Sequence, residues 1–261
     1  NGVVQTGSGN ITLHGTGGIG GGNAHGIELT GLVKSTNNGI IDITGVSGAG
    51  AASGSAGIIA FLSTGKVESN GSITLTGTPG SNAESVGIEI QQASSVQATG
   101  ATGEIHIIGT SGVGTLSTTN VLSGVVINDA SVTCEENVIE INGTSHAVRS
   151  VGKGVTIAYS PITMINGNIT IDGYGSLDTT NAGTESNYGV LCYGIGTDIK
   201  TTGTGNVVIN GYGGSKELPI GCKISAGAFV RATGAGGVTI NGYGGKETPG
   251  AGEQAGYEAY G

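Results

Sequence analysis

The chain has 261 residues, of which 55 are glycine, about three times the usual share, and only 10% are charged. Nine Lys and Arg against 18 Asp and Glu give a net charge of −9, which argues against binding to nucleic acid or to an anionic membrane surface. Apolar runs are only a few residues long, so no segment is predicted to span a bilayer. Glycine does not recur at every third position, which excludes collagen, and 36% hydrophobic residues suffice for a packed core.

A seven-residue unit of the form Gly-x-aliphatic-x-aliphatic-x-Gly appears first at Gly9–Gly15. Eight copies, one of them a variant that begins with Asn137, start at residues 9, 39, 71, 103, 137, 167, 205 and 236. Successive starts lie 30 to 38 residues apart. So narrow a spacing indicates a tandem repeat rather than an effect of composition.

Each unit is followed by a polar loop and a second short segment, at residues 26–29, 57–60, 87–90, 124–127, 189–192, 221–224 and 256–259. In the fifth copy we assign this segment to residues 146–148, where its glycine is missing. A third segment precedes the next unit, at residues 33–35, 67–69, 96–98, 132–134, 199–201 and 230–232. Three short strands per repeat predict an all-β fold, a parallel β-helix (a solenoid) of about eight coils of about 30–38 residues.

The alternating aliphatic residues of the first segment are predicted to stack into inward-facing columns between coils. The first column, a core ladder, contains Ile11, Ile41, Ile73, Ile105, Ile139, Ile169, Val207 and Val238. Burial of such columns is the main stabilising contribution, at about 25 cal/mol per Å² of apolar surface. Glycine is expected at the ends of each strand because sharp corners need φ values that other residues resist.

Two other β architectures fit less well. A β-sandwich would need hairpin turns of about two to five residues, whereas the loop after the first strand is about ten residues or longer. A β-propeller needs four strands per repeat and usually a Trp-Asp signature, and the chain has no tryptophan. Both comparisons favour the β-helix.

The motifs at Gly9–Gly18, Gly26–Leu29 and Val33–Gly39, with their counterparts along the chain, resemble the repeats of filamentous-haemagglutinin-like adhesins. These are large exoproteins of bacterial two-partner secretion. The resemblance covers essentially the whole chain and implies a right-handed β-helix that is exported and displayed outside the cell. The family's N-terminal secretion domain has no counterpart here, and three cysteines are unusual for such an exported chain.

Residues 1–261 are therefore predicted to form one β-helix solenoid segment, uncapped at both ends and part of a longer chain or assembly. We expect an extracellular or cell-surface stalk or fibre of a bacterium, structural and adhesive, whose partners are adjoining coils or other copies of itself, and host or matrix glycans. An alternative is a self-assembling subunit that stacks head to tail through its open ends. A more distant alternative is a β-helix that binds or cleaves polysaccharides.

No catalytic constellation, cofactor site or metal site stands out, so the chain is predicted not to be an enzyme. Asp42 is expected between threonines, Asp172 in a ladder with asparagines, and Glu28 and Glu89 two coils apart. Glu140 is expected beside His106, and this pair fits exposed polar neighbours better than an acid–base pair. His14 and His25 could flank the first long loop, but two ligands alone make a weak zinc site.

One corner of the predicted coil changes character along the chain. The residue after the closing glycine of each unit is threonine or valine in the first five coils and tyrosine in the last three, at Tyr174, Tyr212 and Tyr243. These tyrosines are predicted to form an aromatic ladder on the surface. The ladder could bind sugars or a partner strand, or it could simply stiffen the corner.

The three cysteines, Cys134, Cys192 and Cys222, have no CxxC spacing and are odd in number. They are expected to be small buried apolar residues without a disulfide or a metal.

Overall fold

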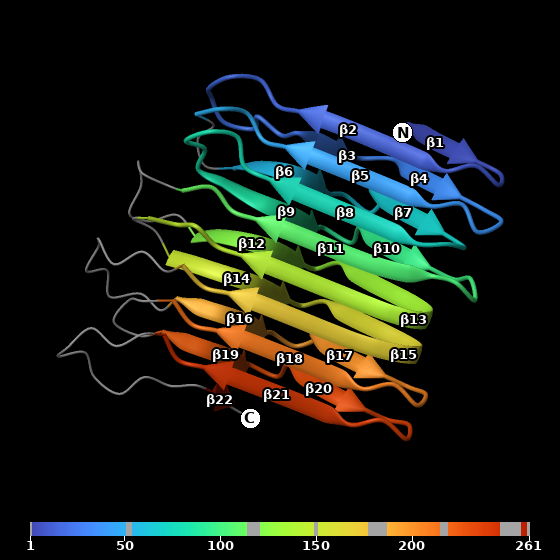
Figure 1. Cartoon of the computed structure of the whole chain (residues 1–261), viewed down its shortest axis with the longest axis vertical. Helices are drawn as coiled ribbons and strands as arrows, with labels where there is room; N and C mark the ends of the chain where they lie inside the picture. Colours follow the sequence, from blue (N-terminus) through green and yellow to red (C-terminus); the bar gives the residue numbers. More distant parts are fainter. Residues whose placement is uncertain are drawn as a thin grey trace.

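A computed structural model of the chain describes residues 2–50, 54–113, 121–148, 151–176, 187–214 and 219–245, and the backbone of residues 257–259. The described residues form strands and connecting turns only, and they wind into a right-handed parallel β-helix (Figure 1). The predicted fold class is therefore confirmed. None of the described residues forms a helix that could cross a membrane.

Each coil contributes one strand to each of three faces, and all strand pairs are parallel. Face 1 contains β1 (Val3–Thr6), β4 (Leu32–Ser35), β7 (Lys66–Ser69), β10 (Ser95–Ala98), the first parts of β13 (Ser131–Thr144) and β15 (Pro161–Tyr174), β17 (Asp198–Thr201) and β20 (Phe229–Ala232). Face 2 contains β2 (Ile11–Thr16), β5 (Ile41–Val46), β8 (Ile73–Thr78), β11 (Glu104–Thr110), the second parts of β13 and β15, β18 (Val207–Tyr212) and β21 (Val238–Tyr243). Face 3 contains β3 (Ile27–Leu29), β6 (Ser55–Ala60), β9 (Ser85–Gln91), β12 (Val121–Asn128), β14 (Val151–Ala158), β16 (Tyr188–Tyr193), β19 (Ile220–Ser225) and β22 (Tyr257–Ala259).

Each face is thus eight strands deep, which corresponds to about seven full turns of the solenoid. Faces 1 and 2 join into one 14-stranded sheet because β13 and β15 continue through the corner that a turn occupies in the other coils. Asn137 and Gly167 adopt positive φ values of 67° and 152° at this corner and lie opposite each other. Two separate strands were predicted in each of these coils, because the sequence pattern does not show that the pairing continues through the corner.

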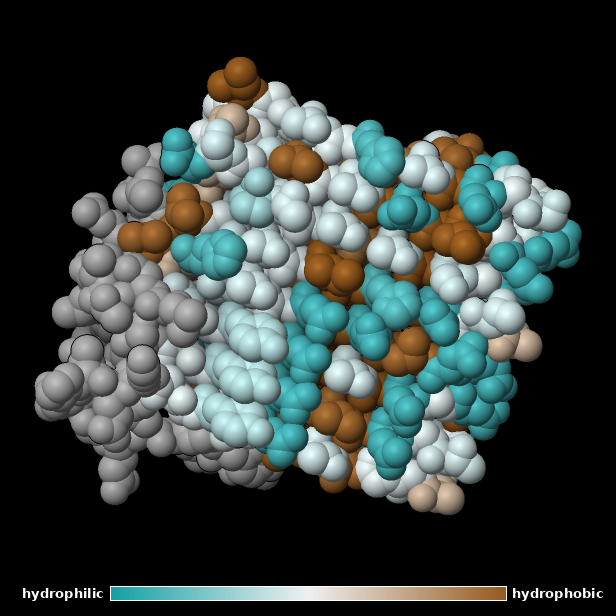
Figure 2. Space-filling model, viewed as in Figure 1, coloured by the Kyte–Doolittle hydropathy of each residue, from teal (hydrophilic) through white to brown (hydrophobic). Residues whose placement is uncertain are grey.

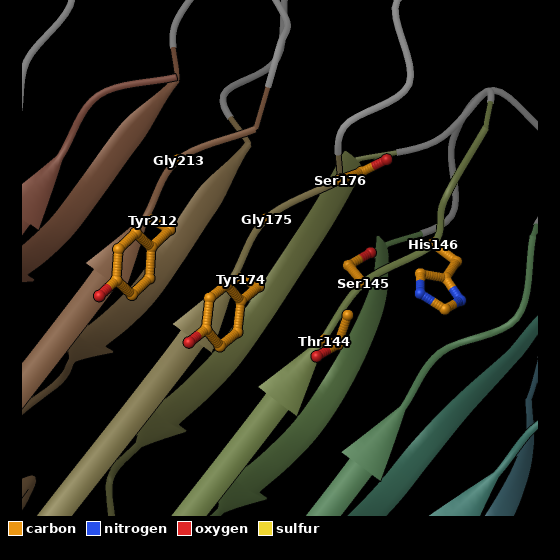
Figure 3. A pocket seen from close by; sticks show the side chains of 8 residues that line it. All are labelled: Thr144, Ser145, His146, Tyr174, Gly175, Ser176, Tyr212 and Gly213. Carbon is orange, nitrogen blue, oxygen red and sulfur yellow. The ribbon is translucent and has the colours of Figure 1, made fainter. Parts of the chain in front are cut away.

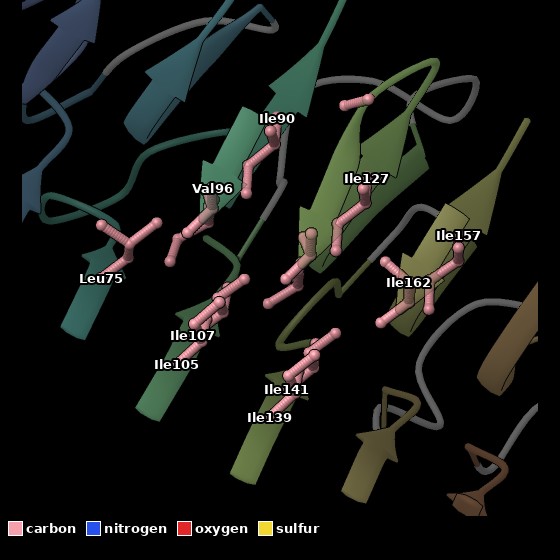
Figure 4. Close-up of a cluster of buried hydrophobic side chains, with 14 of the residues drawn as sticks. Leu75, Ile90, Val96, Ile105, Ile107, Ile127, Ile139, Ile141, Ile157 and Ile162 are labelled. Atoms are coloured by element: carbon pink, nitrogen blue, oxygen red, sulfur yellow. The ribbon is translucent and has the colours of Figure 1, made fainter. Parts of the chain in front are cut away.

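The core lies between the three faces and is built from stacked aliphatic side chains (Figure 4). The core ladder lies in register over all eight coils, from the Ile11–Ile41 pair to the Val207–Val238 pair. Its first seven residues are at most 7% exposed, including Ile11 on the first strand of the face, whereas Val238 on the last strand is 41% exposed. Burial is therefore nearly complete wherever a coil has neighbours on both sides.

The closing glycines of face 2 have a different role from the one expected. None of these glycines adopts a positive φ in the described residues, so the prediction that they are needed for unusual φ values at the corner is wrong. A Cβ atom on Gly45 would lie 2.1 Å from the carbonyl oxygen of Gly57, and one on Gly109 would lie 2.1 Å from that of Gly124. These glycines form a seam where faces 2 and 3 approach so closely that no side chain fits between them.

The face-3 strand of the fifth coil lies later in the chain than predicted. Residues 146–148 are not in a strand, and the strand is β14, which contains Gly154. A Cβ atom on Gly154 would lie 2.2 Å from the backbone nitrogen of Tyr174, and Gly143 faces the Gly154 carbonyl oxygen at the seam. The glycine of this coil is therefore present, 11 residues after Gly143, which is the spacing from Gly15 to Gly26 in the first coil.

All three cysteines are free and buried. Cys134 ends the face-1 part of β13, where its Sγ donates a hydrogen bond to the carbonyl oxygen of Gly103 at 3.3 Å. The Ser69 hydroxyl donates in the same way to Gly39 at 2.6 Å, so this thiol replaces a corner serine. Burial raises the pKa of Cys134 to about 11 and that of Cys222 to about 12, and it also raises the pKa of Cys192.

Candidate functional site

The tyrosine stack is the most distinctive side-chain arrangement on the outer surface. Tyr174, Tyr212 and Tyr243 end successive strands of face 2, and the strand register places them opposite one another. The ring centroids of Tyr174 and Tyr212 are 4.7 Å apart with planes 2° from parallel, and those of Tyr212 and Tyr243 are 4.8 Å apart at 9°. These distances match the separation of hydrogen-bonded strands, about 4.8 Å, so the β-ladder itself sets the stacking distance.

The stack remains accessible from outside the solenoid. Three parallel rings lie one above another on the surface in the lower half of Figure 2. Tyr174 is 44% exposed and Tyr243 is 50% exposed. Desolvation by neighbouring side chains raises the pKa of Tyr212, and the nearby Tyr174, Tyr243 and Asp172 raise it further. The Tyr212 hydroxyl is therefore neutral at physiological pH and able to donate a hydrogen bond.

A hollow of about 470 Å³ lies beside the stack and reaches from Thr144 past Tyr174 to Tyr212 and Gly213. The described residues that line it are Thr144, Ser145, His146, Tyr174, Gly175, Ser176, Tyr212 and Gly213. Figure 3 shows the rings of Tyr174 and Tyr212 parallel, with Thr144 next to the outer face of Tyr174 and His146 beyond Thr144. The hollow therefore begins where the corner column changes from threonine to tyrosine.

Two buried serines fix the backbone segments that line this hollow. The Ser145 hydroxyl donates to the carbonyl oxygen of Leu122 at 2.9 Å, and the Ser176 hydroxyl donates to that of Ala147. The backbone nitrogen of His146 donates to the Ser111 hydroxyl at 3.0 Å. These bonds connect successive coils, so the wall that carries Thr144 and His146 is part of the rigid solenoid.

A polar ladder runs beside the tyrosine stack on the same strands. The Asn210 amide donates to Asp172 at 2.7 Å, and the Asn241 amide donates to Asn210 at 2.8 Å. Asp172 pairs with Asn142 in the strand register, as predicted from the repeat. The carboxylate of Asp172 is therefore engaged in the ladder.

His106 is held between two carboxylates on the outer surface of face 2. Its Nδ1 lies 2.9 Å from Glu140 Oε2, and its Nε2 lies 3.4 Å from Glu104 Oε2. The repeat predicted Glu140 beside His106, whereas the contact with Glu104 was not predicted. Residues 104 and 106 of one strand point to the same side, and this period of two could have revealed the third member.

Asp42, Glu28 and Glu89 lie on three different strands. Asp42 lies between Thr12 and Thr74, as expected from the repeat. Glu28 and Glu89 lie two strands apart on face 3, with Ile59 between them, beside a second hollow of about 430 Å³. Burial raises the pKa of Glu89.

The histidines are dispersed in the same way. His14 lies on β2, whereas the Nδ1 of His25, in the following loop, accepts a hydrogen bond from the backbone nitrogen of Ala56 at 3.1 Å. In the described part of the chain, no group of three or more His, Cys, Asp or Glu side chains is placed to hold a metal ion.

The hollow beside Tyr174 was not predicted from the sequence. Residues 146–148 had been assigned to a strand, which would have placed His146 on face 3 and away from the tyrosines. The sequence signal for the hollow is the change from Thr144 to Tyr174 between successive coils of one column, together with the loop that follows Thr144.

Comparison of the chain with protein-family models, with curated proteins and with solved structures found no significant match.

Proposed function

We propose that this chain is a section of an extracellular structural β-helix of a bacterial surface or secreted exoprotein. It acts as a stalk or fibre and performs no catalysis. The observation that carries this proposal is the unbroken strand register on three faces, with one continuous core and a glycine seam repeated in successive coils. A solenoid of this kind has no internal domain boundary at which it could hinge, and it lengthens simply by adding coils.

The surface chemistry supports the same proposal. Polar uncharged side chains and glycines dominate the turns, and only 10% of the residues are charged. The resemblance to adhesin repeats, based on the glycine and aliphatic motifs, supports an exported location. The tyrosine stack with its hollow is our candidate for contact with glycans of a host or of an extracellular matrix.

Surface labelling of the source bacterium tests the location. An antibody raised against the folded chain is applied to intact cells and to permeabilised cells. We expect labelling of intact cells, and loss of that signal after brief treatment with an added protease. Labelling that occurs only after permeabilisation would contradict an extracellular role.

The mass of the native polypeptide separates a stalk from the self-assembling alternative. Under denaturing and reducing conditions, a mass several times the 25.3 kDa of this chain supports one section of a long exoprotein. A mass close to 25.3 kDa, in material that forms fibres before denaturation, supports subunits that stack head to tail.

Adhesion tests the role of the tyrosines separately. Replacing Tyr174, Tyr212 and Tyr243 together by threonine restores the residue type of the earlier coils without changing the core. We expect weaker adhesion to glycan-coated surfaces at unchanged surface labelling. Unchanged adhesion would show that the stack only stiffens the corner.

A further inference from the structure

The two ends of the tyrosine stack differ in what lies beyond them. Tyr243 is on the last strand of face 2, whereas Tyr174 has a further strand on its outer side. The residue in register with Tyr174 on that strand is Thr144, whose short side chain cannot cover an aromatic ring. One face of the Tyr174 ring stacks on Tyr212, and the other borders a gap inside the solenoid surface (Figure 3).

The gap is large enough for a single ring-shaped molecule. The hollow has a volume of about 470 Å³, within the range of about 300–1,000 Å³ typical of small-molecule sites. A ring stacked on the outer face of Tyr174 would lie about one strand separation, about 4.8 Å, from the Tyr174 ring, at the level of Thr144. A flat molecular face of about the size of a tyrosine ring would therefore lie parallel to Tyr174.

The side chains around the gap select for an uncharged, hydroxylated molecule. None of the eight described lining residues is Asp, Glu, Lys or Arg. The hydroxyls of Ser145 and Ser176 are already bonded to backbone carbonyls. In contrast, no hydrogen bond joins the Thr144 hydroxyl or the His146 ring to another described residue, so both can bond a ligand.

We propose that the outer face of Tyr174 binds the apolar face of a neutral pyranose, whose hydroxyl groups hydrogen-bond to Thr144 and His146. The aromatic face supplies contact area and orientation, and the two polar side chains distinguish a sugar from a purely apolar ring. This inference rests on the proposed extracellular role in so far as the sugar is part of an external glycan.

Saturation-transfer NMR on the purified chain tests the site directly. The probes are the methyl β-pyranosides of glucose, galactose and N-acetylglucosamine, with methyl glucuronide as a charged comparison and p-cresol as an aromatic one. We expect saturation of pyranose ring protons from the protein's aromatic protons, with a dissociation constant on the order of 1 mM for the best neutral sugar. Binding of p-cresol without any neutral sugar, or stronger binding of the glucuronide, would overturn the proposal.

Substitutions locate the binding. T144Y places a fourth ring in the gap and is expected to weaken sugar binding at least tenfold, whereas T78Y, the same change in the same column away from the stack, leaves it unchanged. Y174L keeps an apolar side chain but removes the flat ring, and H146A removes one hydrogen-bonding partner. Both are expected to weaken binding. Equal binding by T144Y and the parent chain would place any sugar elsewhere.

This result is independent of the cell experiment. Absence of sugar binding by the purified chain leaves surface labelling of intact cells unaffected. Conversely, an intracellular location would refute the proposed function without changing the NMR result.

Discussion

Two columns on the same strands of face 2 follow different rules. The core ladder, which begins at Ile11, is aliphatic at every position and is buried until the last coil. The corner column, which begins at Thr16, changes from threonine or valine to tyrosine at Tyr174. An inward side chain must pack against two other faces as well as its axial neighbours, whereas a corner side chain contacts mainly its axial neighbours. Packing therefore fixes the first column, and the second is free to acquire a binding role.

The largest expected effect comes from the seam that allows the inward column to pack. Gly143→Val would place a Cβ atom 2.1 Å from the carbonyl oxygen of Gly154, a backbone atom that no side-chain movement can relieve. We expect a loss of about 4–5 kcal/mol or more in unfolding free energy, measured by urea denaturation. Gly18→Val is the matched control, because nothing lies within 4 Å of a Cβ there, and it should change stability by less than about 0.5 kcal/mol. Equal effects at both positions would contradict the seam.

The next effect tests burial within the core ladder. Ile105→Ala removes a fully buried side chain with neighbouring strands on both sides and should cost about 2–5 kcal/mol in unfolding free energy. Val238→Ala, at the exposed end of the same ladder, should cost less than about 1 kcal/mol. If the two losses were alike, position along the solenoid would not determine the contribution of the column.

Much of this fold could be predicted from the sequence because each coil repeats the same packing problem. The spacing of aliphatic pairs between glycines was sufficient to align Ile11 with Ile41 and Tyr174 with Tyr212. Membership of either column depends only on the position of a residue within its strand, because side chains alternate between the two sides of a strand.

Features that depend on variable loops or on contacts between faces could not be predicted in this way. The strand that contains Gly154 was misplaced because a short aliphatic stretch directly after β13, at residues 146–148, was taken for it, although Gly154 follows Gly143 by 11 residues just as Gly26 follows Gly15. The closing glycine Gly143 was attributed to an unusual φ value, because the sequence does not show how closely faces 2 and 3 approach each other. The hollow beside Tyr174 depends both on a loop and on a contact between strands, because His146 lies in the loop after β13 and Tyr174 ends β15.

A smaller effect, of opposite sign, is expected in the corner column. Thr144→Tyr extends the stack by one ring, and an aromatic pair contributes about 0.5–1.5 kcal/mol beyond its burial. We expect a gain in unfolding free energy within this range, measured by urea denaturation beside T78Y, which has no aromatic neighbour in the column. Destabilisation by Thr144→Tyr alone would show that the space beside Tyr174 cannot hold a ring.

The smallest effect concerns an ion pair on the outer surface of face 1. Arg231 Nε and Nη2 donate to the two carboxylate oxygens of Asp198 at 2.8 and 2.6 Å, and Lys200 Nζ lies 3.2 Å from the second oxygen. Burial raises the pKa of Asp198, but hydrogen bonds and charge from Arg231 and Lys200 outweigh it, so the pKa lies below its ordinary value. Solvent screens such surface pairs, so Asp198→Asn should cost only about 0.2–1 kcal/mol in unfolding free energy at neutral pH.

The pH dependence of this loss identifies its cause. A carboxyl group whose pKa is lower in the folded state stabilises the protein fully above its unfolded pKa of about 3.9, and this stabilisation is lost as the pH falls through the folded value. The stability difference between the parent chain and Asp198→Asn should therefore be constant above about pH 5, shrink below about pH 4 and decrease in high salt. A difference that persists at low pH would assign the effect to packing. The outer surface would then contribute to stability by the same means as the core, contrary to the contrast between the two columns.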